Sequence, residues 1–331
     1  MSHHPRTRVA LGLLMAGSLT AVAACSGGAD SAAGSAGADG ELTPVSIGTI
    51  PAILSAPLFV GIEEGIFEEH GLDVEVNFAD GGAAVIPSVL SGENQFGYSN
   101  TVSLLAAFGE GLPLSLAHSA WAPHGELELD DHAVLVLPDS GITEPADLEG
   151  KNIAVNTLQN IGEVHIRQVF ENLDLDADTL SWTQLPFADM SEALRRGDVD
   201  AIWVSEPFVA PALEEGWVRV ISPGAQSFPE EVSGYYTTSR QFAESDPEVV
   251  AAFREAMAEV NEFAEENPEL VREAATSQMG IDADVAAVVN LPMFPNDLDT
   301  QPLQDYAAAA VRFGILAGEP EDYDALIAPS S

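Results

Sequence analysis

Residues 92–105, GENQFGYSNTVSLL, constrain the fold more than any other stretch of the chain. Residues 95–98 have the composition of a short strand. Ser99, Asn100 and Thr101 then favour the start of a helix, which the apolar run 102–108 continues. A strand that leads directly into a helix places free backbone N–H groups and the positive end of a helix dipole at one edge of a sheet. Such edges bind small polar or anionic ligands, although a single unit of this kind is also an ordinary turn between a strand and a helix.

The same unit recurs at Gly197, which lies 105 residues after Gly92 (197 − 92 = 105). Aligning the two glycines pairs Glu93 with Asp198, Gln95 with Asp200, Tyr98 with Trp203 and Asn100 with Ser205. Both copies run in the order helix, glycine, acidic residue, strand, helix cap and helix. This internal repeat predicts two lobes of similar construction.

Strand and helix patterns alternate around both copies. Strands are expected at residues 45–49, 72–78, 151–155 and 179–185, and helices at residues 58–64, 83–90, 163–172 and 188–196. The clearest strand is 72–78, where apolar and polar residues alternate strictly. This order predicts an α/β fold with mainly parallel sheets that helices cover on both faces.

Two further strands are expected to join the lobes. Residues 133–137 form an apolar strand that leaves lobe one, and residues 234–239 are the candidate return strand. The rest of the chain is expected to form helices at residues 247–266, 268–279, 282–289 and 301–316, which pack back on lobe one. We therefore expect residues 42–137 and 238–331 in lobe one and residues 138–237 in lobe two, with a two-strand hinge and a cleft between them.

Residues 1–24 have the pattern of a lipoprotein signal peptide. Arg6 and Arg8 precede an apolar run that is too short and too rich in small residues to span a bilayer, and VAAC at residues 22–25 matches a lipoprotein signal-peptidase site. Cys25, the one cysteine of the sequence, is expected to carry the lipid anchor; the alternative is a free thiol after an ordinary signal peptide. Residues 25–41 are expected to be a flexible tether, since residues 26–40 contain only Ser, Gly, Ala and Asp.

The net charge of −42, from 53 acidic and 11 basic residues, narrows the classes of partner. Such a charge repels nucleic acid and anionic lipid head groups, which makes both poor partners. It does not identify a ligand, because most of the acidic residues lie on expected helix faces and in loops, where a solvated face explains them. The same composition fits a protein adapted to high salt.

A closing cleft needs polar groups that converge from both lobes. The candidates in lobe one are Ser55, Gly82, Asn100 and Thr101, and those in lobe two are Asn156, Thr157, Asn160, Ser205 and Glu206. Asn100, Thr157 and Ser205 fit helix caps equally well, and a cap uses the same helix terminus as a ligand. No arginine fork for a bidentate oxyanion is evident, so an anion would be held by N–H and hydroxyl groups. A neutral or aromatic solute is equally open.

Aromatic and histidine side chains provide candidates for the walls of the cleft. Trp121, Trp203 and Tyr235 are flat enough to contact a ligand, and Trp203 is favoured because it lies beside Ser205 at a strand end. His118 follows an apolar strand and could also face the cleft. His118, His124 and His132 stand among acidic residues, but their spacings match no tight metal-binding motif, so neither a metal nor another cofactor is expected.

Five stretches together resemble one family of proteins. They are SAPLFVGIEEGIFEEHGLDVEV (55–76), VLSGENQFGYSNTVSLL (89–105), DSGITEPADLEGKNIAV (139–155), ALRRGDVDAIWVSEPF (193–208) and SRQFAESDPEVVAAF (239–253). Taken together, they resemble the substrate-binding proteins of ABC importers for nitrate, alkanesulfonates, taurine and thiamine-pyrimidine precursors, from about residue 45 to the C-terminus. The resemblance implies a two-lobed periplasmic-binding-protein type II fold that closes on a small solute and delivers it to a membrane permease. It does not imply which solute.

The resemblance also bears on Glu206 and on the location of the protein. Because Glu-Pro-Phe after this strand is a feature of the family, Glu206 is interpreted first as a structural residue or a contact for the permease. The expected protein is a monomer, lipid-anchored to the outer face of the cytoplasmic membrane, with a small solute and an ABC permease as partners. An enzyme is the competing class, since some eukaryotic pyrimidine-synthesis proteins share the fold, and a sensor without transport is the third. Against an enzyme, the sequence has no Gly-x-Ser-x-Gly, His-Glu-x-x-His or phosphate-loop motif.

Overall fold

The first of two sheets has five strands in the order β2-β1-β3-β10-β4. These strands are β1 (Thr43–Thr49), β2 (Leu72–Phe78), β3 (Phe96–Asn100), β4 (Leu114–Trp121) and β10 (Gly234–Ser239). β1 is parallel to β2 and β3, whereas β10 is antiparallel to β3 and β4. Every residue of β3 and β4 is buried, as expected of apolar strands that are covered on both faces.

The second sheet also has five strands, in the order β7-β6-β8-β5-β9. These strands are β5 (His132–Val136), β6 (Asn152–Val155), β7 (Ser181–Gln184), β8 (Ala201–Ser205) and β9 (Val218–Ile221). β6 is parallel to β7 and β8, and β5 is antiparallel to β8 and β9. The two strand orders match if β1, β2, β3, β10 and β4 correspond to β6, β7, β8, β5 and β9, so the repeat extends to the topology of both sheets.

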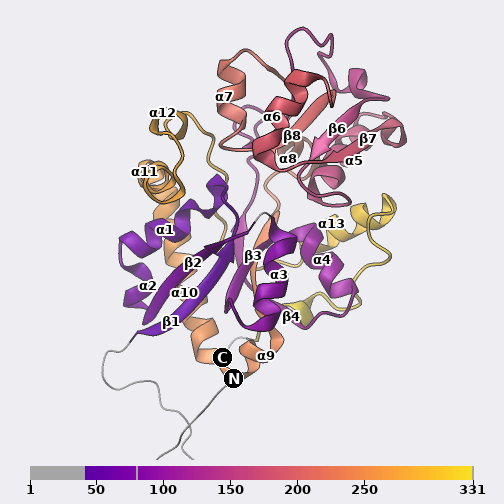
Figure 1. The fold of residues 1–331 in the computed structure, drawn as a ribbon. Helices are drawn as coiled ribbons and strands as arrows, with labels where there is room; N and C mark the ends of the chain where they lie inside the picture. Colours follow the sequence, from indigo (N-terminus) through magenta and orange to yellow (C-terminus); the bar gives the residue numbers. More distant parts are fainter. Residues whose placement is uncertain (1–41, 80, 330–331) are drawn as a thin grey trace, which may run out of the picture. The chain divides into compact units, whose positions relative to one another are not determined.

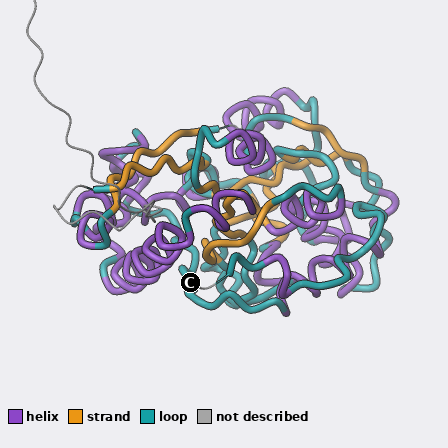
Figure 2. Tube along the Cα trace, turned by 90° about the horizontal axis from the view of Figure 1, so that it is seen from below, coloured by secondary structure: helices purple, strands orange, loops and turns teal. Residues whose placement is uncertain are grey.

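Helices surround both sheets in the computed structural model, which describes residues 42–79 and 81–329. They are α1 (Ala56–Glu63), α2 (Ile66–Glu69), α3 (Gly82–Ser91), α4 (Thr101–Gly109), α5 (Ile161–Asn172), α6 (Phe187–Arg196), α7 (Val209–Glu214), α8 (Pro223–Ser227), α9 (Arg240–Ser245), α10 (Pro247–Glu266), α11 (Pro268–Met279), α12 (Ala283–Ala286) and α13 (Gln301–Arg312). Figures 1 and 2 show the strands in the interior and the helices around them. The described residues belong to one compact unit, Glu41–Ser331, and one hydrophobic core includes side chains of both sheets.

The local details of the repeat follow the sequence alignment closely. Gly92 and Gly197 end α3 and α6 in the left-handed conformation, with φ of 78° and 74°. The aligned side chains of Gln95 and Asp200 make equivalent hydrogen bonds. Gln95 accepts a backbone N–H of β1 and Asp200 accepts a backbone N–H of β6, both at 2.8 Å. The copies differ after the strand. Asn100 caps α4, but Ser205 caps nothing, because the chain continues through Glu206 before α7 begins at Val209.

Several elements differ from the sequence-based expectation. β5 was expected at the end of lobe one but lies in the second sheet. β10 was expected mostly in lobe two but lies in the first sheet. β9 and α8 were not predicted. α13 ends at Arg312, four residues early, because Gly314 takes a positive φ of 69° and the Ile315 amide folds back to the Ala310 carbonyl at 2.8 Å.

The predicted signal peptide, Cys25 and the tether lie outside the described residues. Among residues 42–79 and 81–329, no helix has both the length and the apolar character needed to cross a bilayer.

Candidate ligand-binding site

The N-terminus of α3 lies against the loop that follows β6 in the second sheet. A Cβ added to Gly81, the residue before α3, would be 3.7 Å from Thr157 Oγ1 and 4.0 Å from Asn156 Nδ2. The next residue, Gly82, is packed against the end of β3, since an added Cβ would be 3.1 Å from the Asn100 nitrogen. Loops predicted for opposite sides of a cleft therefore meet at this helix start.

The N-termini of α4 and α5 are joined directly. Asn100 Oδ1 accepts the Ser103 amide at 3.0 Å and caps α4, while Asn160 Oδ1 accepts the Ile161 amide at 2.9 Å and caps α5. The Asn160 side-chain amide also donates to Ser103 Oγ at 2.8 Å, which links the first turns of the two helices. Three helix N-termini thus converge, and each contributes partial positive charge.

We call this group of residues the inter-sheet cluster. Its members are Gly81, Gly82, Ser99, Asn100, Ser103, Asn156, Thr157 and Asn160. Ser99 is fully buried, its hydroxyl has no hydrogen-bond partner among residues 42–79 and 81–329, and it would lie 2.9 Å from a Cβ on Gly82. An unpaired buried polar group destabilises a folded protein by about 1–3 kcal/mol, so a ligand that hydrogen-bonds to Ser99 would remove this destabilisation.

A stack of three rings runs beside the cluster. The His132 ring lies 4.9 Å from the Trp121 ring at an interplanar angle of 20° and 5.1 Å from the Trp203 ring at 25°. Burial lowers the pKa of His132, but the Asp131 carboxylate, with smaller contributions from Asp130 and Glu206, outweighs burial and raises it. When His132 is protonated, its imidazolium gains cation–π attraction from the two indole faces.

The two tryptophans make different contacts beyond the stack. Trp121 Nε1 donates to the Tyr98 hydroxyl at 2.9 Å, on the face of β3 opposite to Ser99, because side chains alternate along a strand. The ring of Trp203 fills the space above Gly162 at the start of α5, where an added Cβ would be 2.9 Å from ring carbons. Trp203 Nε1 and His132 Nδ1 are buried without a hydrogen-bond partner among the described residues.

The other predicted residues make contacts elsewhere. Ser55 Oγ bonds to Thr49 Oγ1 and to the Ile50 carbonyl, and Thr101 Oγ1 donates to the Val232 carbonyl. His118 Nδ1 donates to the Ser119 carbonyl, and burial lowers its pKa to about 4, so it is neutral.

Tyr235 lies beside the cluster, whereas Ser205 does not contribute to it. Tyr235 pairs in register with Ser99, its buried hydroxyl has no partner among the described residues, and burial, followed by the charges of Asp299 and Glu231, raises its pKa. Ser205 Oγ donates to the Glu206 carbonyl.

Sequence reasoning missed Gly81, Ser99, Ser103, Asp131 and His132. Gly81 and Ser99 adjoin predicted residues, so the helix-start pattern could have included them. Ser103 lies within the first turn of α4, where a hydroxyl reaches the same space as the cap. Asp131 and His132 were seen only as part of an acidic, histidine-containing region, because nothing in sequence spacing shows which rings will stack.

Asp130, Asp131 and His132 are buried and bring three possible metal ligands within 4.8 Å of one another. The two Asp130 carboxylate oxygens already accept the His132 and Ala225 amides, both at 3.0 Å. Each of these oxygens keeps a second lone pair, so the bonds do not remove Asp130 as a metal ligand, and the group offers three ligand atoms, the lower limit for protein ligands in zinc sites.

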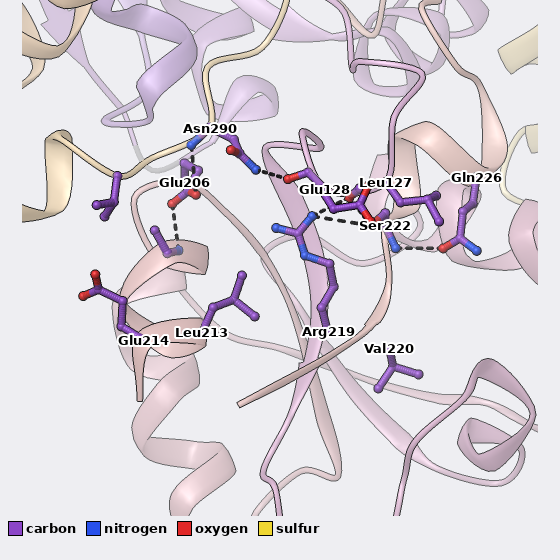
Figure 3. A pocket seen from close by; sticks show the side chains of 12 residues that line it. Leu127, Glu128, Glu206, Leu213, Glu214, Arg219, Val220, Ser222, Gln226 and Asn290 are labelled. Atoms are coloured by element: carbon purple, nitrogen blue, oxygen red, sulfur yellow. Dashed lines mark hydrogen bonds between the residues drawn. The ribbon is translucent and has the colours of Figure 1, made fainter. Parts of the chain in front are cut away.

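A separate pocket of about 560 Å³ lies between the second sheet and the segment after α12 (Figure 3). Glu206 reaches it, with Oε2 accepting the Ala210 amide at 3.1 Å and Oε1 accepting the Asn290 amide at 3.3 Å. Burial raises the pKa of Glu206 to about 7. None of the twelve residues that line this pocket has a buried polar atom without a partner, unlike Ser99 and Trp203. The inter-sheet cluster is therefore the better candidate for the binding site.

Residues 53–271 match the family model described as NMT1/THI5 like. The chain belongs to the NMT1/THI5-like family. The resemblance to the binding proteins of ABC importers that the sequence motifs indicated is thereby confirmed.

Two curated relatives differ in what their names describe. The taurine-binding periplasmic protein of Escherichia coli (strain K12) is 24% identical over 203 residues, which is 61% of this chain and 61% of that protein. The match therefore spans less than two thirds of that relative's length. A 4-amino-5-hydroxymethyl-2-methylpyrimidine phosphate synthase of Aspergillus parasiticus is 28% identical over 147 residues, 44% of this chain and 40% of the synthase.

A solved structure confirms the predicted fold. The periplasmic aliphatic sulphonate-binding protein of Escherichia coli superimposes with a TM-score of 0.70 at 18% identity, covering 86% of this chain and 97% of that one. The α/β periplasmic-binding-protein fold predicted from the sequence is therefore correct.

Proposed function

We propose that this protein is an extracytoplasmic solute-binding protein that captures a small organic anion in the inter-sheet cluster and delivers it to an ABC importer. The observation that carries the proposal is the convergence of the α3, α4 and α5 N-termini near Ser99, whose buried hydroxyl has no partner in the part of the chain that the structure describes. N–H groups and hydroxyls hold an anion there without an arginine. The taurine-binding and sulphonate-binding proteins among its relatives and structural neighbours support this ligand class.

Capture works by hinge closure of two lobes, one built on each sheet. The bond from Asn160 to Ser103 joins helices that belong to different sheets, so it forms only when the lobes are together. A solute that bonds to both helix starts binds the closed state better than the open state and shifts the population towards closure. Small-angle scattering should show compaction when the solute is added, and an unchanged radius of gyration with a tightly bound solute would contradict hinge closure.

The lipid anchor at Cys25 and the permease belong to the same proposal. The signal-peptidase pattern at residues 22–25 supports anchoring on the outer face of the membrane, where a tethered binding protein meets its permease. Mass spectrometry of the protein from membranes should show a mature chain that begins at a lipid-modified Cys25. A soluble chain with a free thiol at this position would overturn the anchor and leave solute binding untouched.

An enzyme of pyrimidine biosynthesis is the second candidate, because one relative is a synthase. We favour the binding protein, since the inter-sheet cluster supplies hydrogen-bond donors but no residue with the geometry of a nucleophile and its base. The two candidates differ in what happens to the solute. A binding protein returns it unchanged after denaturation, whereas recovery of a chemically altered solute would establish an enzyme.

We expect an anionic solute to raise the melting temperature of the purified protein in a screen of alkanesulfonates, taurine, nitrate, aromatic acids and pyrimidines. A ligand at 100 times its Kd adds about 2.7 kcal/mol to the stability of the native state. Asn160→Ala should weaken binding about fivefold, because one net hydrogen bond between the helix starts is lost.

Asn172→Ala is the matched control for this screen, since Asn172 ends the same helix and bonds to the Gln226 carbonyl, away from the cluster. Equal effects of the two variants on binding would contradict the site. A screen in which only uncharged solutes bind would contradict the anionic ligand.

A further inference from the structure

Asp131 and His132 carry buried polar atoms that the protein leaves without hydrogen bonds. Asp131 is fully buried, and neither of its oxygens has a hydrogen-bond partner among residues 42–79 and 81–329; the same holds for His132 Nδ1. Asp131 Oδ1 lies 3.1 Å from His132 Nδ1, which is within ion-pair distance but not aligned as a hydrogen bond. A buried carboxylate is costly unless it is paired and hydrogen-bonded, so these atoms are suited to a further partner.

The same atoms have the spacing of two ligands on one metal ion. Two atoms bonded to Zn²⁺ at about 2.1 Å lie roughly 3.4 Å apart at a tetrahedral angle and about 3.1 Å apart at an angle slightly above 90°. The third ligand atom comes from Asp130, and all three lie within 4.8 Å of one another. Two carboxylate oxygens and one imidazole nitrogen form a donor set that zinc accepts, whereas Mg²⁺ and Ca²⁺ prefer oxygen ligands alone.

The charges around these atoms also favour a divalent cation. Asp130 and Asp131 are both fully buried, and a protonated His132 balances only one of the two carboxylates. The Arg219 guanidinium donates to the Leu127 and Asp130 backbone carbonyls instead. A divalent ion bound to two carboxylates and a neutral imidazole leaves the buried site with no net charge.

Neighbouring groups hold the three ligands in place. The two Asp130 oxygens accept the His132 and Ala225 amides, both at 3.0 Å, and each keeps a lone pair for a metal. The His132 ring is held between the Trp121 and Trp203 rings, at centroid distances of 4.9 and 5.1 Å. Such outer contacts orient the ligands of metal sites. Sequence spacing did not indicate this site, because consecutive residues of a strand direct their side chains to opposite faces.

We propose that Asp130, Asp131 and His132 bind one divalent transition-metal ion, preferably Zn²⁺, at the start of β5. The inter-sheet cluster contains none of these residues, so the site is separate from solute capture. With three protein ligands the ion keeps a fourth position for water, and its bond to Asp130, which holds the Ala225 amide, fixes the start of β5 against α8. Opening of the lobes, which the proposed function includes, separates Trp121 of the first sheet from His132 of the second and gives the ion an entry path.

Zinc titration of the purified full-length protein tests the site. The protein is first treated with EDTA, and the chelator is then removed. Isothermal titration with ZnCl₂ should show one ion per chain with a Kd of about 1 μM or less. Asp131→Asn keeps the shape of the side chain but removes its charge. It should weaken zinc binding about 100-fold or more, because loss of an outer-shell partner alone lowers metal affinity about 10–100-fold.

His70→Gln is the matched control for zinc binding. His70 also lies beside two carboxylates, at 2.9 Å from Glu259 and 3.8 Å from Glu255, but both of these acids are exposed. The control should keep the zinc affinity within about threefold. Loss of binding in His70→Gln would assign the ion to the surface and overturn the proposal, as would unchanged affinity in Asp131→Asn.

Cobalt reports the position of the ion without a variant. Co²⁺ occupies zinc sites and, because it is paramagnetic, quenches fluorophores in its immediate vicinity. It should therefore quench the fluorescence of Trp121 and Trp203, whose rings stack on His132, and added Zn²⁺ should restore the signal. Bound Co²⁺ that leaves the tryptophan fluorescence unchanged, or failure of the unsubstituted protein to bind either ion, would overturn the site even if Asp131→Asn does not fold.

Discussion

Trp203→Ala is expected to lower the free energy of unfolding by about 3–5 kcal/mol, the cost of emptying a buried site of tryptophan size. Trp203 is 2% exposed and stacks on His132 at 5.1 Å, with Phe187 on another side at 5.8 Å. Its removal would leave a cavity above Gly162 and take away one of the two indole faces that stack on His132. Chemical denaturation followed by circular dichroism measures the loss.

Trp182→Ala is the control for this substitution. Trp182 lies in the edge strand β7 of the same sheet and is only partly buried, with the Arg167 guanidinium 5.6 Å from its ring. Its loss should cost clearly less, about 1–2 kcal/mol, because water already reaches part of the ring. Equal losses in the two variants would contradict the view that the ring stack is a central support of the second sheet.

Gly82→Ala is expected to weaken binding of the solute about 100-fold. The new Cβ would lie 3.0 Å from the Ser99 Cα and 3.1 Å from the Asn100 nitrogen, and since both are backbone atoms the start of α3 must move away from β3. That shift removes the first-turn N–H groups of α3 from the anion, and two hydrogen bonds to a charged group account for a change of this size.

The preceding glycine provides a matched control. Gly81 has an extended backbone with φ of −173°, and its added Cβ would make only an ordinary contact of 3.7 Å with Thr157 Oγ1. Gly81→Ala should therefore keep affinity within about threefold. Isothermal titration compares the two variants; similar losses in both, or none in Gly82→Ala, would contradict close packing of the α3 N-terminus as the basis of anion binding.

The parts of the fold that depend on local pattern were predictable. The glycine that ends a helix, the acidic or amide residue that follows, and the strand after it recur at residues 92 and 197, and the structure gives Gln95 and Asp200 the same bond to a neighbouring strand. The repeat predicted two lobes of similar construction, and the two sheets of the structure share one strand order. The sheets to which β5 and β10 belong were harder to predict from the sequence, because both strands come from segments outside the alternating runs of strand and helix.

In the candidate site, too, residues with a local sequence pattern were predictable, whereas residues that long-range contacts bring together were not. Asn100 was found because caps have a sequence pattern, and Asn160 because it lies in a polar loop before a predicted helix; in the structure both are caps, and a hydrogen bond links their helices. Ser205 was expected at a cap on the strength of the alignment, but its copy of the repeat continues into Glu206 instead. The pairing of Asp131 with His132 and the two tryptophans depends on contacts between β4, β5 and β8, which are distant in sequence.

A crystal structure of the protein with the tightest-binding solute of the screen tests the central claim most directly. The account predicts the anionic group within about 3 Å of the first-turn N–H groups of α3 and α4 and of the Ser99 hydroxyl. A solute bound instead in the pocket beside Glu206 and Arg219, with the inter-sheet cluster empty, would contradict it.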